Sequence, residues 1–271
     1  MTTPPPPSPQ PTDPPSTTPQ PTGSPSTTPQ PTGSPSTTPQ PGPDPAQAPV
    51  VFDAPFADRT QWAAGTTSAY PAGGRNTGDN KLDRLVPGYG PKGDVFTALR
   101  ESTFSWRTPL VTTEGTAGGF ELRPGDRLEA RCLVTADQGV WPGIWTWGRD
   151  LAPGRPQPGH GEVDVLEYHD DHPRMLELSN HVRPGAPAYL DDLVTPGQWF
   201  TVACVFGTDS VDWELDGRAV HSDGQGVGPD WRAWIIVNLS VAGGQWGHRR
   251  PRANAGRLSW RCQGLTVRRP Q

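Results

Sequence analysis

The chain has 271 residues, among them 36 prolines, 32 glycines and 11 tryptophans, and its formal net charge is −5. This mild acidity gives no electrostatic reason to expect binding to nucleic acid or to an anionic membrane. No apolar run approaches the about 20 residues that span a bilayer, and the N-terminus lacks the basic and apolar regions of a signal peptide. We therefore expect no nucleic-acid partner, no membrane partner and no signal peptide in the chain.

Residues 1–48 differ in kind from the rest of the chain. They hold half of the prolines, and a ten-residue unit repeats there as PTDPPSTTPQ, PTGSPSTTPQ and PTGSPSTTPQ. A segment with so few apolar side chains cannot offset the entropy cost of ordering its backbone. We predict a disordered Pro-rich tether over residues 1–48, partly in polyproline-II conformation, and one folded domain over residues 49–271. Without the tether acids Asp13 and Asp44, the net charge of that domain is −3.

Short apolar stretches separated by Gly, Pro, Asp and Asn run through the folded part, and helical periodicity is weak. Many strands with short turns and no helices between them predict an all-β fold, a β-sandwich of jelly-roll type. Asp216-Gly217 suits a tight turn and predicts a hairpin over residues 215–218. The predicted strands cover residues 94–98, 103–106, 118–122, 127–133, 143–147, 162–168, 175–181, 199–206, 210–215, 233–241 and 257–268.

A tryptophan-rich stretch lies at residues 139–148 (GVWPGIWTWG). If it is extended, Trp141, Gly143, Trp145 and Trp147 share one face. Indoles suit places that are half apolar and half wet, because the ring is large and its N–H needs a partner. A sugar-binding cleft is such a place, and it is the favoured interpretation for Trp141 and Trp145. For Trp147 a place in the sandwich core is an equal alternative.

Three acids follow at the spacing E-x-D-x-x-E within an otherwise apolar run. Strand alternation puts Glu162 and Asp164 on one face, and a bulge at Val165 or Leu166 would return Glu167 to that face. Acids gathered in this way raise one another's pKa values and are costly to bury. A glycosidase needs one ionised carboxylate and one protonated carboxyl. A solvated strand face and a hard-cation site are the alternatives, and the apolar spacers argue against both.

Three cysteines, Cys132, Cys204 and Cys262, each lie in a strand-like context. Their odd number forbids complete internal pairing, and their spacing does not indicate a metal site. We interpret them as buried thiols that pack like small apolar residues. One disulfide between two of them is left open.

These segments resemble glycoside hydrolase family 16. Residues 162–167 (EVDVLE) are similar to the family's E-[ILV]-D-[IVAF]-x-E motif, and residues 141–145 (WPGIW) are similar to its WPAxW segment. Further similar stretches follow in the same order at residues 179–182, 197–206, 211–218, 235–246 and 265–268. The resemblance implies a concanavalin A-like jelly roll and a retaining endo-glycosidase. Its substrate would be a polysaccharide with β-1,3 or β-1,4 linkages, first of all a β-glucan.

The resemblance also implies roles for the three acids. Glu162 would be the nucleophile, Glu167 the general acid and then the general base, and Asp164 would lie between them and tune both. The resemblance implies no required cofactor and no catalytic metal, and it allows a structural calcium ion.

Other residues are expected to bind the substrate. Trp141, Trp145 and Trp246 would stack on sugar rings, and Asn80 would take the place of the family's sugar-binding asparagine. His181 either hydrogen-bonds one of the acids or is an interior histidine. Asn238 is expected to be structural.

Two other interpretations of function are carried forward. A carbohydrate-binding module could keep this fold without its chemistry, although binding alone does not need a proton donor facing a nucleophile. The tether and the missing leader also suit a phage tail protein that grips or trims a host polysaccharide. We therefore expect an extracellular or virion-associated protein, whose tether could contact other virion proteins.

Overall fold

The computed structural model describes residues 45–70, 80–148, 161–183, 185, 187–245 and 247–271. Most of the tether predicted for residues 1–48 therefore lies outside the described residues. Within its last four residues, Pro45–Gln47 form a short 3-10 helix, and Ala48 is buried. The carbonyl of Ala48 accepts a hydrogen bond of 2.9 Å from Arg268 Nη1, so packing begins a few residues before position 49. No described helix has the length and apolar character to cross a membrane.

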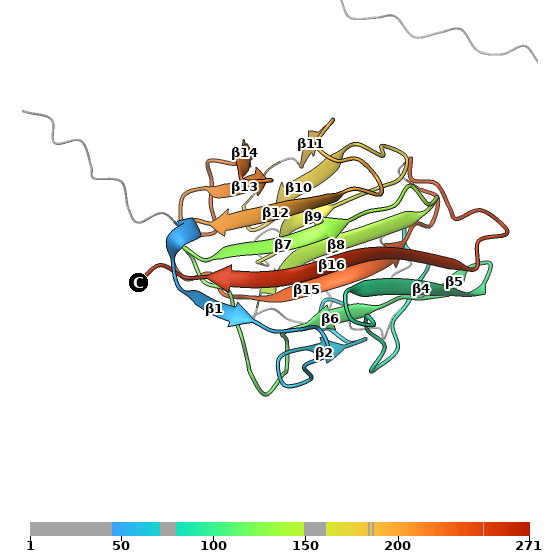
Figure 1. Ribbon diagram of the computed structural model, residues 1–271, viewed down its shortest axis with the longest axis horizontal. Coiled ribbons are helices and arrows are strands. Elements are labelled where there is room, and N and C mark those ends of the chain that lie inside the picture. Colours follow the sequence, from blue (N-terminus) through green and yellow to red (C-terminus); the bar gives the residue numbers. More distant parts are fainter. Residues whose placement is uncertain (1–44, 71–79, 149–160, 184, 186, 246) are drawn as a thin grey trace, which may run out of the picture. The chain divides into compact units, whose positions relative to one another are not determined.

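Two sheets packed face to face make up the described domain, and their strands run along its length (Figure 1). This is the predicted all-β jelly-roll sandwich, and its core lies between the sheets. The first sheet has the order β14 (Arg218–Ser222), β13 (Val211–Leu215), β12 (Trp199–Phe206), β7 (Arg127–Leu133), β16 (Arg257–Arg268), β4 (Val95–Ser102), β5 (Ser105–Arg107), β3 (Asp83–Arg84), with β1 (Val50–Asp53) beside β16. The second sheet has the order β11 (Ala188–Leu190), β10 (Leu176–Asn180), β9 (Val163–Glu167), β8 (Val140–Gly148), β15 (Ala233–Val241), β6 (Leu110–Thr112), β2 (Ala63–Ala64).

Most predicted strands are confirmed, and four of them (β7, β12, β15 and β16) have the predicted bounds. The strand predicted over residues 118–122 is wrong, because only an isolated bridge between Leu122 and Ala233 forms there. The chain turns just before Leu122: the Gly119 amide donates to the Thr116 carbonyl at 3.2 Å, and Gly119 has a φ of 56°. A turn of this kind uses the backbone groups that a strand would need.

The predicted hairpin is confirmed as the connection between β13 and β14. Asp216 and Gly217 have φ values of 49° and 74°. Two consecutive positive φ values are typical of the type I′ turn, whose twist matches that of the flanking strands.

The three cysteines are free and buried, as the preferred interpretation predicts, and none forms a disulfide. They lie on the neighbouring strands β12, β7 and β16 of the first sheet, where Cys132 is directly opposite Cys262. Burial raises the pKa values of the Cys132 and Cys204 thiols. These thiols are therefore packing residues with little reactive thiolate.

Strand β8 has both faces covered, and all nine of its residues are buried. Val140 and Ile144 pack into the main core between the sheets. Trp145 and Trp147 point to the opposite face, where they form a second apolar cluster with Leu85, Leu110 and Ile236. The predicted alternation of residues 139–148 is thus confirmed, and it places the tryptophans on the outer face of the second sheet.

Candidate active site

A bulge in strand β9 brings the three acids to one face. Opposite β8, Asp164 pairs with Trp145 and Leu166 pairs with Ile144, so Val165 is one residue too many. Opposite β10, the register shifts between the Asp164–Ser179 and Glu167–Glu177 pairs in the same place. The extra residue restores Glu167 to the face of Asp164, as the spacing predicts.

An indole from the first sheet contacts this bulge across the sandwich. Trp213 of β13 is fully buried, and its Nε1 donates a hydrogen bond of 3.0 Å to the backbone carbonyl of Asp164. A buried carbonyl needs such a donor, because an unpaired one keeps its desolvation cost. Trp213 therefore ties the backbone that presents the acids to the rigid core.

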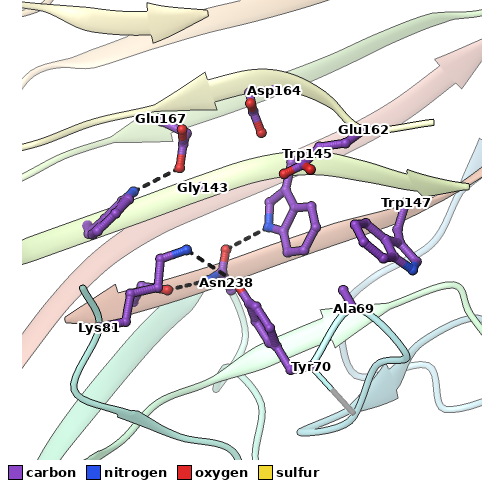
Figure 2. Close-up of a pocket in the computed structure, with 12 residues that line it drawn as sticks. Ala69, Tyr70, Lys81, Gly143, Trp145, Trp147, Glu162, Asp164, Glu167 and Asn238 are labelled. Carbon is purple, nitrogen blue, oxygen red and sulfur yellow. Dashed lines mark hydrogen bonds between the residues drawn. The ribbon is translucent and has the colours of Figure 1, made fainter. Parts of the chain in front are cut away.

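The acids open into a pocket on the outer face of the second sheet (Figure 2). The side chains from β8 and β15 form its floor, and residues from the loop before β3 close one side. Its lining consists of Ala69, Tyr70, Lys81, Trp141, Gly143, Trp145, Trp147, Glu162, Asp164, Glu167, Asn238 and Ser240. A concave site that combines aromatic walls with converging carboxylates is typical of small-molecule and sugar sites.

Glu167 is held in its protonated form. Burial raises the pKa of Glu167 to about 8, and the negative charges of Asp164 and, to a smaller degree, Glu177 act in the same direction. The charge of Lys81 and a hydrogen bond of 2.9 Å from Trp141 Nε1 to Glu167 Oε1 lower this pKa. The sequence argument expected the acids to raise one another's pKa values, whereas burial is the larger cause for Glu167 and the charge of Asp164 comes second. Glu167 thus carries a proton at neutral pH.

Asp164 forms an ion pair with His181. Their Oδ2 and Nε2 atoms are 3.1 Å apart, and this contact raises the pKa of His181 to about 9. The histidine is therefore protonated at neutral pH and places a positive charge beside the acids. Of the two roles considered for His181, the structure shows the hydrogen bond to an acid.

Trp145 is held by a polar chain rather than by packing alone. Its Nε1 donates to Asn238 Oδ1 at 3.1 Å, and Asn238 Nδ2 donates to Ser240 Oγ at 2.8 Å. The Tyr70 ring lies 5.9 Å from the indole of Trp145, measured between centroids. Asn238 has the structural role expected for it, although it also lines the pocket. Trp246, which was expected to stack on sugar, lies outside the described residues.

The structure gives Asn80 a role other than the expected sugar binding. Its side chain is 2% exposed, and both amide atoms are engaged by the backbone of Gln245, with Nδ2–O and Oδ1–N distances of 2.6 Å. Asn80 also has a φ of 59°, a conformation that Asn tolerates better than most residues. Its amide fixes the loop after β15 and is not presented to the pocket.

Sequence reasoning missed Lys81 and Tyr70. Lys81 Nζ lies 4.4 Å from the centre of the Trp141 ring and 3.3 Å from the Tyr70 hydroxyl. These two residues belong to no motif, and the fold brings them to the pocket of the acids from the segment between β2 and β3. The one available signal was that Lys81 is one of only two lysines in the chain.

Comparisons with known proteins place this architecture in one structural class. No family model matches the chain, and no curated protein matches it. Among solved structures, the endo-beta-1,3-glucanase from Pyrococcus furiosus is 20% identical, with a TM-score of 0.60 over 80% of this chain and 93% of that chain. The laminarinase from Flavobacterium sp. UMI-01 is 21% identical, with a TM-score of 0.63 over 82% of this chain and 100% of that chain.

A non-specific endo-beta-1,3(4)-glucanase from family GH16 is also similar, with 20% identity and a TM-score of 0.61 over 85% of this chain and 96% of that chain. The chain therefore has the jelly-roll sandwich fold of these β-glucanases. More narrowly, the chain has the laminarinase-like fold of glycoside hydrolase family 16, and the resemblance inferred from sequence is confirmed at the level of the fold. At these identities the comparison establishes architecture, and activity has to be argued from the site.

Proposed function

We propose that the protein is a retaining endo-glycosidase that hydrolyses β-1,3 or β-1,4 linkages of a β-glucan. The observation that carries this proposal is Glu167, a buried carboxyl with a pKa of about 8 on the same pocket face as Glu162 and Asp164. A carboxylic acid that stays protonated at neutral pH beside other carboxylates is the arrangement needed to cleave a glycosidic bond. The glucanase fold supports the same class of substrate.

The first step transfers the sugar to the protein. Glu167 gives its proton to the glycosidic oxygen as the bond to the anomeric carbon breaks. The carboxylate of Glu162 attacks that carbon from the other face, so a covalent glycosyl ester forms and the leaving chain departs as an alcohol.

The second step releases the sugar. Esterification removes the negative charge of Glu162, and Glu167 is now a carboxylate. Glu167 takes a proton from a water molecule, the hydroxyl attacks the anomeric carbon, and the ester bond to Glu162 breaks. Two inversions give retention of configuration, and both carboxyl groups return to their starting states.

Digestion of a glycan panel tests the proposal. Laminarin, lichenan and agarose are incubated with the purified full chain, and the products are separated by size. We expect oligosaccharides from laminarin or lichenan, and proton NMR of the first products should show β-anomers. The absence of products from every glycan would overturn the hydrolase assignment and leave a carbohydrate-binding module. Initial α-anomers would contradict the retaining mechanism alone.

The Asp164→Asn variant should shift the pH dependence. The acid works only when protonated, so kcat/KM should fall as the pH rises through the pKa of Glu167, about 8. The negative charge of Asp164 raises that pKa. Its removal lowers the pKa of Glu167, and the alkaline limb of the profile should move to lower pH. An unmoved limb, or a move to higher pH, would contradict this assignment.

The Trp141→Phe variant should move the same limb in the opposite direction. The hydrogen bond from Trp141 Nε1 lowers the pKa of Glu167, because it stabilises the carboxylate. Phenylalanine keeps an aromatic face but cannot donate, so the pKa rises and the limb moves to higher pH. Trp147→Phe is the matched control, since Trp147 lines the same pocket without a described contact to Glu167; its alkaline limb should stay where it is.

Three further points stay predictions from the sequence alone: an extracellular or virion-associated location, virion partners of the tether, and a structural calcium ion.

A further inference from the structure

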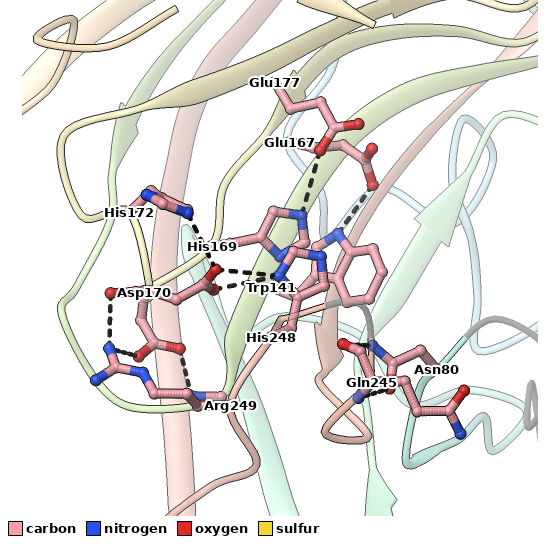
Figure 3. A network of polar contacts seen from close by, with 12 residues as sticks. Asn80, Trp141, Glu167, His169, Asp170, His172, Glu177, Gln245, His248 and Arg249 are labelled. Carbon is pink, nitrogen blue, oxygen red and sulfur yellow. Dashed lines mark hydrogen bonds and ion pairs between the residues drawn. The ribbon is translucent and has the colours of Figure 1, made fainter. Parts of the chain in front are cut away.

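A second cavity of about 600 Å³ adjoins the pocket and shares Trp141 and Glu167 with it. Among the residues that line this cavity, His169 and Asp171 follow strand β9, and His248 lies in the loop between β15 and β16. Figure 3 shows His169 and His248 side by side. The donor atoms of all three residues lie within 4.8 Å of one another. Two imidazole nitrogens and one carboxylate oxygen form a ligand set that suits Zn²⁺ and similar ions, whereas Ca²⁺ and Mg²⁺ prefer oxygen alone.

His169 supplies an independent indication of a ligand. It is 3% exposed, and neither ring nitrogen has a hydrogen-bond partner among the described residues. Its nearest acidic atom, Glu177 Oε2, is 3.7 Å from Nε2, which is too long for a hydrogen bond. Buried polar atoms are nearly always satisfied, so a buried imidazole with two unmet nitrogens points to a bound group.

We propose that His169, Asp171 and His248 bind one divalent ion of the Zn²⁺ type. Three protein ligands leave the fourth tetrahedral position to water or to a ligand in the cavity. Zinc-to-nitrogen bonds of about 2.0–2.1 Å require donor atoms about 3.3 Å apart in a tetrahedral site. The Nδ1 atom of His248 already lies 3.2 Å from Asp171 Oδ1.

The two imidazole rings have to reorient before both can bind one ion. The two imidazoles are stacked, with centroids 3.7 Å apart and an angle of 7° between the planes. A metal lies in the plane of each imidazole that binds it, so ion binding should open this stack by rotation of the side chains. His248 belongs to a loop and can rotate without disturbing a strand.

The backbone that carries the ligands is fixed by their neighbours. Asp170 precedes Asp171, and Arg249 follows His248. Arg249 Nη2 donates to Asp170 Oδ2 at 2.5 Å and to the Asp170 carbonyl at 2.9 Å. The Gly139 amide donates to Asp170 Oδ1 at 2.6 Å. Two segments distant in sequence are thus held together at the level of the backbone, so that only side chains have to move. Glu177, 3.7 Å from His169 Nε2, lies where an outer-shell partner of this ligand would stand.

Zinc binding by the full chain, made without a histidine tag, tests the proposal. After treatment with a chelator, the protein is dialysed against Zn²⁺ or Ca²⁺, and bound metal is measured by atomic emission. We expect one Zn²⁺ per chain. His248→Ala and Asp171→Asn should each weaken Zn²⁺ binding by more than the about 10–100-fold that loss of an outer-shell partner costs. His221→Ala on β14, in the other sheet, should bind like wild type.

Thermal unfolding gives a second measurement that does not depend on hydrolysis. Zn²⁺ should raise the Tm of the wild type and of His221→Ala, and leave that of a folded His248→Ala or Asp171→Asn variant unchanged. The proposal is overturned if wild type retains no Zn²⁺, or if both ligand variants bind it as well as wild type. It is also overturned if Zn²⁺ binding is lost in His181→Ala instead, because the ion would then lie at the catalytic acids. Ca²⁺ binding that depends on His248 would overturn the ligand class.

Discussion

Replacing Glu167 by Gln is expected to lower kcat for β-glucan hydrolysis by about 10²–10⁴-fold, the usual contribution of a general acid. Glutamine has nearly the same shape, and its side-chain oxygen can still accept the hydrogen bond from Trp141. What it lacks is the transferable proton. Glu162→Gln should lose at least as much, because it removes the covalent route itself. Initial rates of reducing-sugar release from the best glucan measure both effects.

The two acids can be told apart by the leaving group. In an aryl glycoside with an acidic phenol, the leaving group departs as a phenolate and needs no proton from Glu167. Its first step should therefore be nearly normal in Glu167→Gln and absent in Glu162→Gln. Both variants should keep the wild-type melting temperature within a few degrees and bind the glucan. Normal hydrolysis of the glucan by either variant would remove the basis of the assigned mechanism.

Trp213→Phe should reduce both stability and turnover. Phenylalanine cannot donate to the Asp164 carbonyl, so the bulge loses a buried hydrogen bond. An acceptor left unpaired costs about 1–3 kcal/mol. A shift of about 1 Å in a catalytic group lowers rates by about 10²-fold, so a 10- to 100-fold fall in kcat is expected. Urea unfolding and steady-state kinetics on the same samples measure the two effects.

Trp260→Phe is the matched control for this change. Trp260 and Trp213 are both on the first sheet, and they are 0% and 1% exposed. The Nε1 atom of Trp260 has no hydrogen-bond partner among the described residues, so Trp260→Phe loses packing only. Trp260→Phe should destabilise the protein by about 1–3 kcal/mol less than Trp213→Phe does, and its kcat should stay near that of wild type. Equal losses of kcat in both variants would show that Trp213 has no specific link to the bulge.

Sequence predicted the parts of the site that depend on one strand. Alternation along residues 139–148 gave the tryptophan face, and the spacing from Glu162 to Glu167 required a bulge. Both patterns are local, because the side-chain period of a strand is fixed by backbone geometry. The long strands β7, β12, β15 and β16 were predictable for the same reason.

The parts that depend on several segments were not predictable. Strands of two or three residues, such as β2, β3 and β11, carry no period of their own and form only beside a neighbour. Asn80 was matched to the family's sugar-binding asparagine only by its place in the sequence. The fold shows that the backbone of Gln245 already occupies its side-chain amide. The stacked pair His169 and His248 likewise joins two loops that no motif connects.

The three free cysteines offer a use that follows from their position. Cys204, Cys132 and Cys262 lie on three adjacent strands of the first sheet, and each is 0% exposed. A water-soluble alkylating reagent reaches them only in molecules whose central strands have separated. The rate of alkylation in native buffer therefore reports how often the sandwich opens. The native cysteines thus make the unfolding rate measurable with no engineered probe and no substrate.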